Sequence, residues 1–238
     1  MALIGFDCDI IFLSYAEPGA EANFRSLLTR YPRTKRLHGV TGMGRAYKMT
    51  AEITDSEYYF IIDADNEILD SFDLNSISIF DQSNIIRVWS AKNAVNGLVY
   101  GYGGLKLCSR EGMRTLQDNT LDVLGSGQNK LIFESQIAGV TCFNTSPYDA
   151  WKAGFRECCM LQAGSGIHMS KEKSLMKLKI WKTKGEDKPF GLWAVRGAHE
   201  GASYAFQHAH DFIALKKIDD PRWLQKEFLT RYPNQEKR

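Results

Sequence analysis

The sequence contains few cysteines and no CxxC pair. There are five cysteines, an odd number: Cys8, Cys108, Cys142, Cys158 and Cys159. This usage is typical of reduced thiols and argues against a disulfide scaffold or a zinc ribbon. No apolar run approaches the ~20 residues that a membrane-spanning helix needs. The first residues include two aspartates and no basic segment, unlike a signal peptide. We therefore expect a cytoplasmic protein without a membrane anchor.

The composition that remains favours a folded globular chain. It has 238 residues, of which 44% are apolar and 12% aromatic, which is enough for a sizeable core. We find no internal repeat and no long linker. We expect residues 1–165 to form a catalytic core and residues 166–238 a C-terminal extension that completes the same domain.

Charge is distributed unevenly, although the net charge is only +2. From Arg25 to Ala51 there are seven Lys or Arg residues and no acid, and from Met49 to Ile86 there are nine Asp or Glu residues and no base. One interpretation is two solvated faces of opposite sign. The other is a site with a cationic wall for phosphates and an anionic wall for a divalent metal.

The first half of the chain alternates between strand and helix patterns. We predict strands at residues 9–15, 34–40 and 58–63 and helices at 20–30 and 44–54. This order implies an α/β fold with a mostly parallel sheet flanked by helices. Ligands of such sheets bind beyond the carboxyl ends of the strands. Two polar segments fall at such ends, Ser14-Tyr15 and Asp63-Ala64-Asp65.

The second half is predicted to add strands and a helical end. Strand-like segments cover residues 73–80, 84–91 and 137–146, and the Gly-rich residues 93–110 indicate a tight β-turn-β element. A helix begins after Ser146, with Pro147 at its first position. Two further helices are expected at residues 199–218 and 220–233.

The segment "YYFIIDADNEIL", residues 58–69, ends an apolar strand in two aspartates one residue apart. Side chains at positions i and i+2 of an extended chain point the same way. Asp63 and Asp65 can therefore hold one hard cation such as Mn²⁺ or Mg²⁺, which prefers oxygen ligands. The alternative is a surface turn with two solvated aspartates.

This segment resembles the DxD motif of GT-A-fold glycosyltransferases, which use nucleotide sugars. "FLSYAEPG" and "GMGRAYKMTAEI" resemble the base-binding strand and the helix that precede that motif. The resemblance implies a GT-A-like sheet and a donor site that includes Ser14, Tyr15, Asp63 and Ala64. It implies that Asp65 binds the metal directly, while Asp63 reaches the ribose or a metal-bound water. A late histidine is the third ligand in several members, for which His199 is the first candidate and His210 the second.

Other candidates surround this motif. Arg45 and Lys48, and less strongly Arg36 and His38, are candidates for the diphosphate, with an exposed cationic face as the alternative. The Gly-rich segment resembles the wall of the donor sugar and acceptor in GT-A enzymes. This assigns Gly103 and Gly104 to the donor, and Asn96, Tyr100 and Lys106 to the acceptor. A hairpin with special turns is the alternative.

An inverting enzyme needs a carboxylate that deprotonates the acceptor. Asp149 stands where many GT-A enzymes carry this base, and Glu134 and Glu157 are its rivals. An Asp in the first turn of a helix also stabilises that helix, which is the alternative for Asp149. The sequence leaves an inverting and a retaining mechanism open.

Three later segments, "NAVNGLVYGYGGLKL", "SPYDAWKAGFRECCML" and "IDDPRWLQKEF", resemble compact bacteriophage glycosyltransferases. Some of these modify hydroxymethylated pyrimidines in phage DNA, including by arabinosylation. The resemblance implies transfer of arabinose or glucose from a UDP-sugar to such a base, in the host cytoplasm. Lys179 and Trp181, in a lysine-rich segment, are candidates for the DNA backbone and a base. A solvated lysine segment is the alternative.

Three other functions compete with this hypothesis. A carbohydrate acceptor, such as a surface-polysaccharide precursor, fits the same chemistry. A sugar-nucleotide pyrophosphorylase is disfavoured, because its Gly-rich, basic signature is missing after the first strand. A non-enzymatic nucleic-acid-binding module explains the basic segments but not the nine acids.

Overall fold

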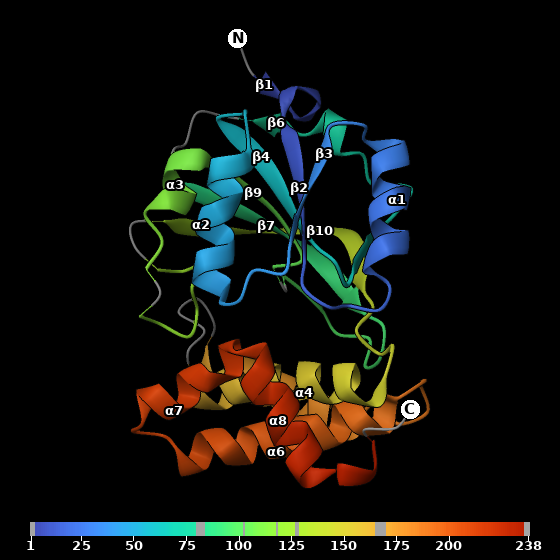
Figure 1. The fold of residues 1–238 in the computed structure, drawn as a ribbon, viewed down its shortest axis with the longest axis vertical. Helices are drawn as coiled ribbons and strands as arrows, with labels where there is room; N and C mark the ends of the chain where they lie inside the picture. Colours follow the sequence, from blue (N-terminus) through green and yellow to red (C-terminus); the bar gives the residue numbers. More distant parts are fainter. Residues whose placement is uncertain are drawn as a thin grey trace. The chain divides into compact units, whose positions relative to one another are not determined.

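The computed structural model describes residues 3–79, 84–101, 103–117, 119–126, 129–164 and 170–235. The chain forms two compact units (Figure 1). Unit 1 comprises Met1–Asn93, Val99–Asp118 and Val123–Cys142, and unit 2 comprises Ala94–Leu98, Asn119–Asp122 and Phe143–Arg238. This division differs from the boundary expected at residues 165 and 166. The helix after Ser146 belongs with the C-terminal helices, because it packs closely against one of them.

Unit 1 is an α/β structure with short connections. Its described helices are α1 (Ala20–Arg30), α2 (Met43–Ile53) and α3 (Arg110–Arg114), with 3-10 turns at η1 (Gly5–Asp7) and η2 (Leu74–Ser76). Its described strands are β1 (Leu3–Ile4), β2 (Asp9–Ser14), β3 (Thr34–His38), β4 (Tyr58–Asp63), β5 (Asn66–Ile68), β6 (Ser78–Ile79), β7 (Ile85–Asn93), β8 (Val99–Tyr100), β9 (Leu105–Ser109) and β10 (Lys130–Thr141). β1 and β6 pair separately from the other strands.

The main sheet has the strand order β3-β2-β4-β9-β7-β10-β5, with β8 beside β7. β2 pairs in parallel with β3 and β4, and β7 in parallel with β10. β9 is antiparallel to both β4 and β7, and β5 and β8 are antiparallel to their neighbours. In the described sheet, β2, β3, β4, β7 and β10 therefore run in one direction. This confirms the expected α/β class with a mostly parallel sheet.

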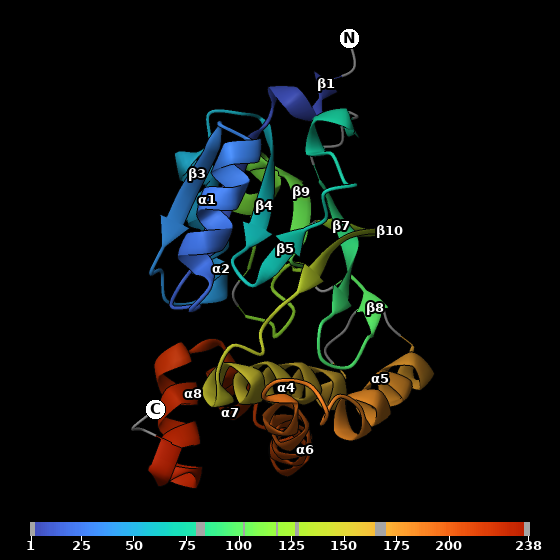
Figure 2. The same ribbon diagram turned by 90° about the vertical axis from the view of Figure 1, so that its right-hand side faces the viewer.

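Helices cover both faces of this sheet (Figures 1 and 2). Phe12 and Phe60 pack with residues of α1, while Ile11 and Ile61, their neighbours in sequence, pack with residues of α2 and α3. This alternation follows from the period of two in a strand. Since both faces are covered, the strands are apolar almost throughout. The carboxyl end of β4 is where this apolar sequence stops.

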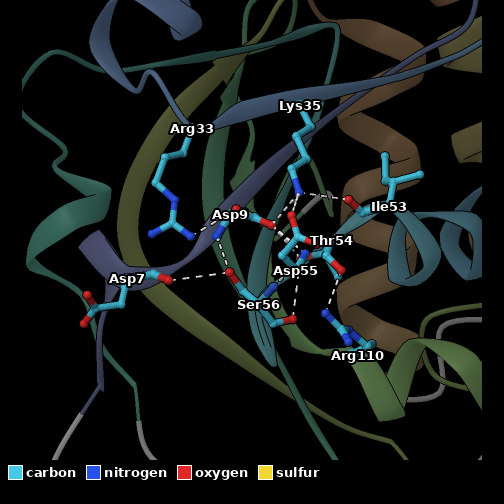
Figure 3. A network of polar contacts seen from close by, with 9 residues as sticks. All are labelled: Asp7, Asp9, Arg33, Lys35, Ile53, Thr54, Asp55, Ser56 and Arg110. Carbon is cyan, nitrogen blue, oxygen red and sulfur yellow. Dashed lines mark hydrogen bonds and ion pairs between the residues drawn. The ribbon is translucent and has the colours of Figure 1, made fainter.

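A network of polar contacts lies at the end of the sheet where β2, β3 and β4 begin (Figure 3). The buried Asp9 carboxylate accepts hydrogen bonds from Asp55 N (2.7 Å), Lys35 Nζ (3.0 Å), Thr54 Oγ1 (3.1 Å) and Arg33 Nη2 (3.2 Å). Burial by itself raises the pKa of Asp9, but these bonds outweigh it and hold that pKa below its usual value. Arg33 and Lys35, two cations of the basic segment, are thus used for structure.

Unit 2 is helical. Its described elements are α4 (Pro147–Ala163), α5 (Lys171–Thr183), α6 (Gly191–Gln207), α7 (Phe212–Lys216), η3 (Lys217–Asp219), α8 (Pro221–Arg231) and η4 (Pro233–Gln235). This confirms the expected helical C-terminal part, although α5 was not predicted and α6 begins earlier than expected. Trp151, Phe155 and Phe228 form the centre of its aromatic core. No helix within the described ranges has the length and apolar character needed to cross a membrane.

Candidate functional site

The carboxyl ends of β2, β3 and β4 bring several predicted site residues to one edge of unit 1. In the register of the sheet, Ser14 lies beside His38, and Asp63 lies beside Leu13. Ser14 is buried, while Asp63 and Asp65 are half-buried. The edge predicted from the strand order therefore carries the polar residues that were expected there.

The Asp63-Ala64-Asp65 turn joins β4 to β5 and is held on all sides. Four hydrogen bonds fix its peptide groups: Asp63 N to Gly104 O (2.8 Å), Ala64 N to Leu13 O (2.9 Å), Cys142 N to Asp65 O (2.6 Å) and Asn23 Nδ2 to Ala64 O (2.9 Å). Ala64 itself is buried. These bonds hold both carboxylates on a rigid backbone, so the turn is preorganised for a ligand.

Of the two glycines assigned to the donor, Gly104 lies directly against this turn, since its carbonyl oxygen accepts from Asp63 N. Gly103 has φ +82°, a left-handed conformation that glycine adopts without strain. A Cβ on Gly104 would lie 2.8 Å from the Cγ of Asn66, the residue that follows the turn. Packing therefore accounts for Gly104, and contact of either glycine with a donor stays a prediction.

Lys106 does not have the place expected of an acceptor-binding residue. Its side chain is 0% exposed, and its ammonium lies 2.9 Å from Asp63 Oδ1 and 4.8 Å from the centre of the Tyr47 ring. Burial opposes the charge of Lys106, but the Asp63 carboxylate outweighs this and raises its pKa. Lys106 is therefore charged and holds Asp63, and the expectation that it reaches an acceptor is wrong.

Ser14 and His38 belong to a second polar chain at this edge. Ser14 Oγ lies 2.9 Å from His38 Nδ1 and accepts a hydrogen bond from Arg36 Nε at 3.0 Å. Arg36 also donates to Glu21 at 2.7 Å. Arg36 thus has two structural partners, while His38 is exposed beside Ser14. Tyr15 begins the following loop, where its N–H donates to the Glu17 carboxylate.

Most cations of the basic segment have a structural partner. Arg25 bonds Glu21, Arg30 bonds backbone carbonyls, Arg33 and Lys35 bond Asp9, and Arg36 bonds Glu21. Arg45 and Lys48 differ, since neither side chain makes an ion pair or a hydrogen bond with any other residue that the structure describes. They line a surface hollow of about 320 Å³ together with Gly44, Met49, Glu52 and Arg114. This leaves them as the cations of the segment that are available to an anionic ligand.

The two carboxylates suit a divalent metal in one specific way. Within the described ranges, no three His, Cys, Asp or Glu side chains come together as ligands. Mn²⁺ and Mg²⁺ at phosphate sites are commonly held by one or two carboxylates, with water and substrate phosphates completing the shell. Asp63 and Asp65 on a fixed turn fit this pattern, and the assignment of Asp65 as the direct ligand stays a prediction.

The histidines proposed as a third ligand belong to unit 2. His199 is exposed on α6, and its Nε2 lies 3.1 Å from the carbonyl oxygen of Lys182. His210 is exposed after α6. Neither residue has a contact that indicates metal binding, and their role as ligands stays a prediction.

Asp149, the first candidate for a base, lies in the first turn of α4, whose N-cap is Ser146. It is buried, and its Oδ2 accepts from Ser146 Oγ at 2.6 Å while its own N–H donates to Ser146 Oγ at 3.0 Å. Lys152 Nζ lies 3.0 Å from Oδ1. Asp149 thus lies in the first turn of α4 and contacts its N-cap, as in the alternative that the sequence left open, an Asp that stabilises the helix N-terminus. The catalytic role of Asp149 stays a prediction.

The rival bases also have charged neighbours. Glu134 on β10 pairs with Arg87 at 2.7 Å. Glu157 on α4 acts electrostatically on Lys177 of α5. Burial lowers the pKa of Lys177 to about 8, and the negative charge of Glu157 opposes this shift. Neither Glu134 nor Glu157 stands out from the other as a base.

The structure revises the acceptor candidates of the lysine-rich segment. The segment is the helix α5, and Trp181 is 2% exposed with its ring stacked on Phe143 at 5.5 Å. Trp181 therefore belongs to the core of unit 2, and the expectation that it offers a stacking face is wrong. Lys177 is also buried, whereas Lys179 is exposed.

The remaining acceptor candidates lie in the Gly-rich segment. Asn96 Oδ1 accepts a hydrogen bond from Leu98 N, which makes a local turn within unit 2. Tyr100 belongs to β8 in unit 1, where it pairs with Ala91. Their contact with an acceptor stays a prediction.

Sequence reasoning missed three residues that shape this site. Asn23 donates a hydrogen bond to the turn, and the Tyr47 ring contacts the Lys106 ammonium. Asn66 packs against Gly104. Asn23 and Tyr47 come from helices on opposite faces of the sheet. In the sequence, each is recognisable only as a polar residue on the side of a helix that is expected to be buried. This pattern does not show which residue it contacts.

Comparison with known proteins finds distant likenesses among solved structures. No protein-family model matches the chain, and no curated protein matches it significantly. A similar solved structure is the mannosyltransferase PcManGT from Pyrobaculum calidifontis in complex with GDP-Man and Mn²⁺. The sequences are 11% identical, the match covers 97% of this chain and 90% of that chain, and the TM-score is 0.43. A likeness at this level says nothing about the ligands of the present chain.

Proposed function

We propose that this protein is a metal-dependent glycosyltransferase of the GT-A type. It would move a sugar, arabinose or glucose, from a UDP-sugar to a hydroxyl group. The observation that carries the proposal is the Asp63-Ala64-Asp65 turn. Its carboxylates end a buried parallel strand, its backbone is fixed by four hydrogen bonds, and a buried lysine holds its first aspartate.

Different residues of unit 1 would bind different parts of the donor. A bound Mn²⁺ or Mg²⁺ supplies Lewis-acid stabilisation of the departing diphosphate. Asp65 would hold this ion, and Asp63 would reach the ribose or a water on the ion. Arg45 and Lys48 supply positive charge for phosphate oxygens. Ser14 and Tyr15 would bind the nucleotide base, and His38 would be a weaker contact of the diphosphate.

The acceptor we favour is the hydroxymethyl group of a modified pyrimidine in DNA. A flipped-out base would be needed to reach the site from a duplex. The exposed lysines of α5, among them Lys173 and Lys179, would contact the DNA backbone. A carbohydrate acceptor is the second candidate, since the donor chemistry is the same.

Calorimetric titration of UDP tests the donor site. We expect the wild-type protein to bind UDP in the presence of Mn²⁺ and not in the presence of a chelator. We expect Asp65→Ala not to bind UDP either with Mn²⁺ or with the chelator. Asp70→Ala is the matched control, because Asp70 is an exposed acid of the same acidic segment. Equal binding of UDP in chelator, or full Mn²⁺-dependent binding by Asp65→Ala, would show that the turn holds no metal.

Labelled UDP-glucose and UDP-arabinose test the acceptor. Label on hydroxymethylated DNA and none on plain DNA supports the proposal. Label on an oligosaccharide with none on either DNA indicates the carbohydrate acceptor. Tight DNA binding without transfer of label from any donor indicates a nucleic-acid-binding module instead.

A further inference from the structure

Lys106 lies beneath the first aspartate of the turn. It is opposite Ile61 in the β4–β9 register, so its side chain is on the same face as Asp63, two residues further along β4. The Lys106 side chain is 0% exposed, while that of Asp63 is 25% exposed. The pair therefore spans the wall of the site, with the ammonium inside the protein and the carboxylate at the surface.

Burial of a lysine is expensive and needs a reason. Lysine is almost never fully buried unless it is paired. Asp63 is the one carboxylate within ion-pair distance of Lys106 among the described residues, and the Tyr47 ring adds a cation–π contact. A pair of apolar side chains of similar volume often stabilises such a position as well as a buried ion pair does, or better. Stability alone therefore does not explain a lysine here, and its effect on Asp63 does.

The lysine changes the charge that the turn presents. Asp63 and Asp65 carry two negative charges, and Lys106 cancels one of them. A divalent cation at this turn meets a net charge of −1 from the three side chains, which leaves one positive charge uncompensated. The diphosphate of a nucleotide supplies the missing negative charge, and its binding in turn benefits from the ammonium.

We propose that Lys106 is a positioning residue that makes metal binding depend on the nucleotide. It holds Asp63 in place and keeps the turn too weakly negative to retain a divalent cation alone. Metal and nucleoside diphosphate then bind together, each raising the affinity of the other by the same factor. This inference rests on the proposed donor site and names how that site is regulated.

Replacing the lysine separates charge from structure. Lys106→Met keeps the length of the side chain and removes its charge, so the turn presents −2. We expect Mn²⁺ alone to bind about tenfold more tightly, and UDP in saturating Mn²⁺ to bind about tenfold more weakly. Paramagnetic resonance of free Mn²⁺ and calorimetry of UDP measure the two affinities. Lys130→Met, at an exposed lysine of the same sheet, should change neither.

The opposite directions of the two shifts make the test specific. A lysine that serves only the fold would, when removed, weaken Mn²⁺ and UDP together or leave both unchanged, and either result would overturn the proposal. Failure of the donor site is seen separately in wild-type protein, as UDP binding that does not respond to Mn²⁺ or to Asp65→Ala.

A second variant covers the case in which Lys106→Met does not fold. Asp63→Asn combined with Lys106→Met replaces the ion pair by a neutral pair and restores a net charge of −1. We expect this double variant to bind Mn²⁺ alone with wild-type affinity, within about threefold. Loss of about tenfold or more in that affinity would show that Asp63 ligates the metal itself, and would overturn the role given to Lys106.

Discussion

Gly197 on α6 faces the carbonyl oxygen of Trp151 on α4 with no room for a side chain between them. A Cβ on Gly197 would lie 2.1 Å from that oxygen. Gly154 and Gly201 make equally close approaches between the same two helices. The helices of unit 2 therefore meet backbone to backbone, and their spacing is set by these glycines.

We expect Gly197→Ala to destabilise the protein by about 3 kcal/mol, since the added methyl group meets backbone atoms that cannot rotate away. Chemical denaturation measures the change. Ser203→Ala, on the exposed side of α6, should alter stability by less than about 0.5 kcal/mol. Equal stabilities of Gly197→Ala and wild type would mean that α4 and α6 are further apart than described.

The Asp9 carboxylate should stabilise, in a pH-dependent way, the end of the sheet where β2, β3 and β4 begin. We expect Asp9→Asn to lower the free energy of unfolding by about 3 kcal/mol, because Lys35, Thr54 Oγ1 and Asp55 N lose the buried carboxylate to which they donate. The folded pKa of Asp9 lies below the unfolded value. Its contribution is therefore complete above about pH 4 and disappears as the pH falls through the folded pKa.

Denaturation of wild type and Asp9→Asn at pH 7 and at successively lower pH measures this. Asp7→Asn, at an exposed neighbour, is the control. A difference between wild type and Asp9→Asn that is constant from neutral to strongly acidic pH would contradict the assignment.

Lys177 should have the opposite effect on stability. Burial lowers its pKa to about 8 in the folded state, against about 10.4 in the unfolded chain. The unfolded state then binds more protons between these values, so wild-type stability rises with pH across that window. Lys177→Met should be more stable than wild type at pH 7 by about 1–2 kcal/mol, after allowance for screening by solvent.

The advantage of Lys177→Met should shrink as the pH rises from about 8 to about 10. Thermal denaturation across this range tests it. Lys179→Met, two residues away and exposed, should show no such trend. A Lys177→Met variant that is less stable than wild type at pH 7 would show that its pairing with Glu157 outweighs its burial.

The cap contacts of Asp149 allow its two roles to be separated. Asp149→Asn and Ser146→Ala each disrupt the contacts between Asp149 and the N-cap Ser146, and each should lower the free energy of unfolding by about 1 kcal/mol. Asn cannot take the proton of an acceptor, so we expect transfer to fall about a hundredfold or more in Asp149→Asn and to stay near normal in Ser146→Ala. Turnover rates check this. Near-normal turnover of Asp149→Asn would move the base to Glu134 or Glu157, or indicate a retaining mechanism.

The sequence predicted the five elements β2, α1, β3, α2 and β4 to within about two residues, because their apolar patterns and flanking loops are clear. It also predicted the N-cap of α4 at Ser146. It missed β5 and α3, which are too short for a periodic pattern. It missed α5 as a helix, because lysines at nearly every turn obscure the few buried positions, Lys177 among them.

Prediction of the site was limited by partners that are distant in sequence. The paired aspartates at the end of β4 were evident from the break in apolar residues. That Lys106 pairs with Asp63 depends on β9 lying beside β4, an arrangement that no local pattern specifies. The burial of Trp181 depends similarly on Phe143, which precedes it by a whole helix.

The place of β9 between β4 and β7 also bears on synthesis of the chain. β2, β3 and β4 leave the ribosome first, while the second edge of β4 stays open until Leu105–Ser109 has been translated. An open edge of an apolar strand is a template for pairing with another chain. A nascent chain that stalls before Leu105 therefore exposes its most apolar strand, and a fragment that ends there will aggregate rather than fold.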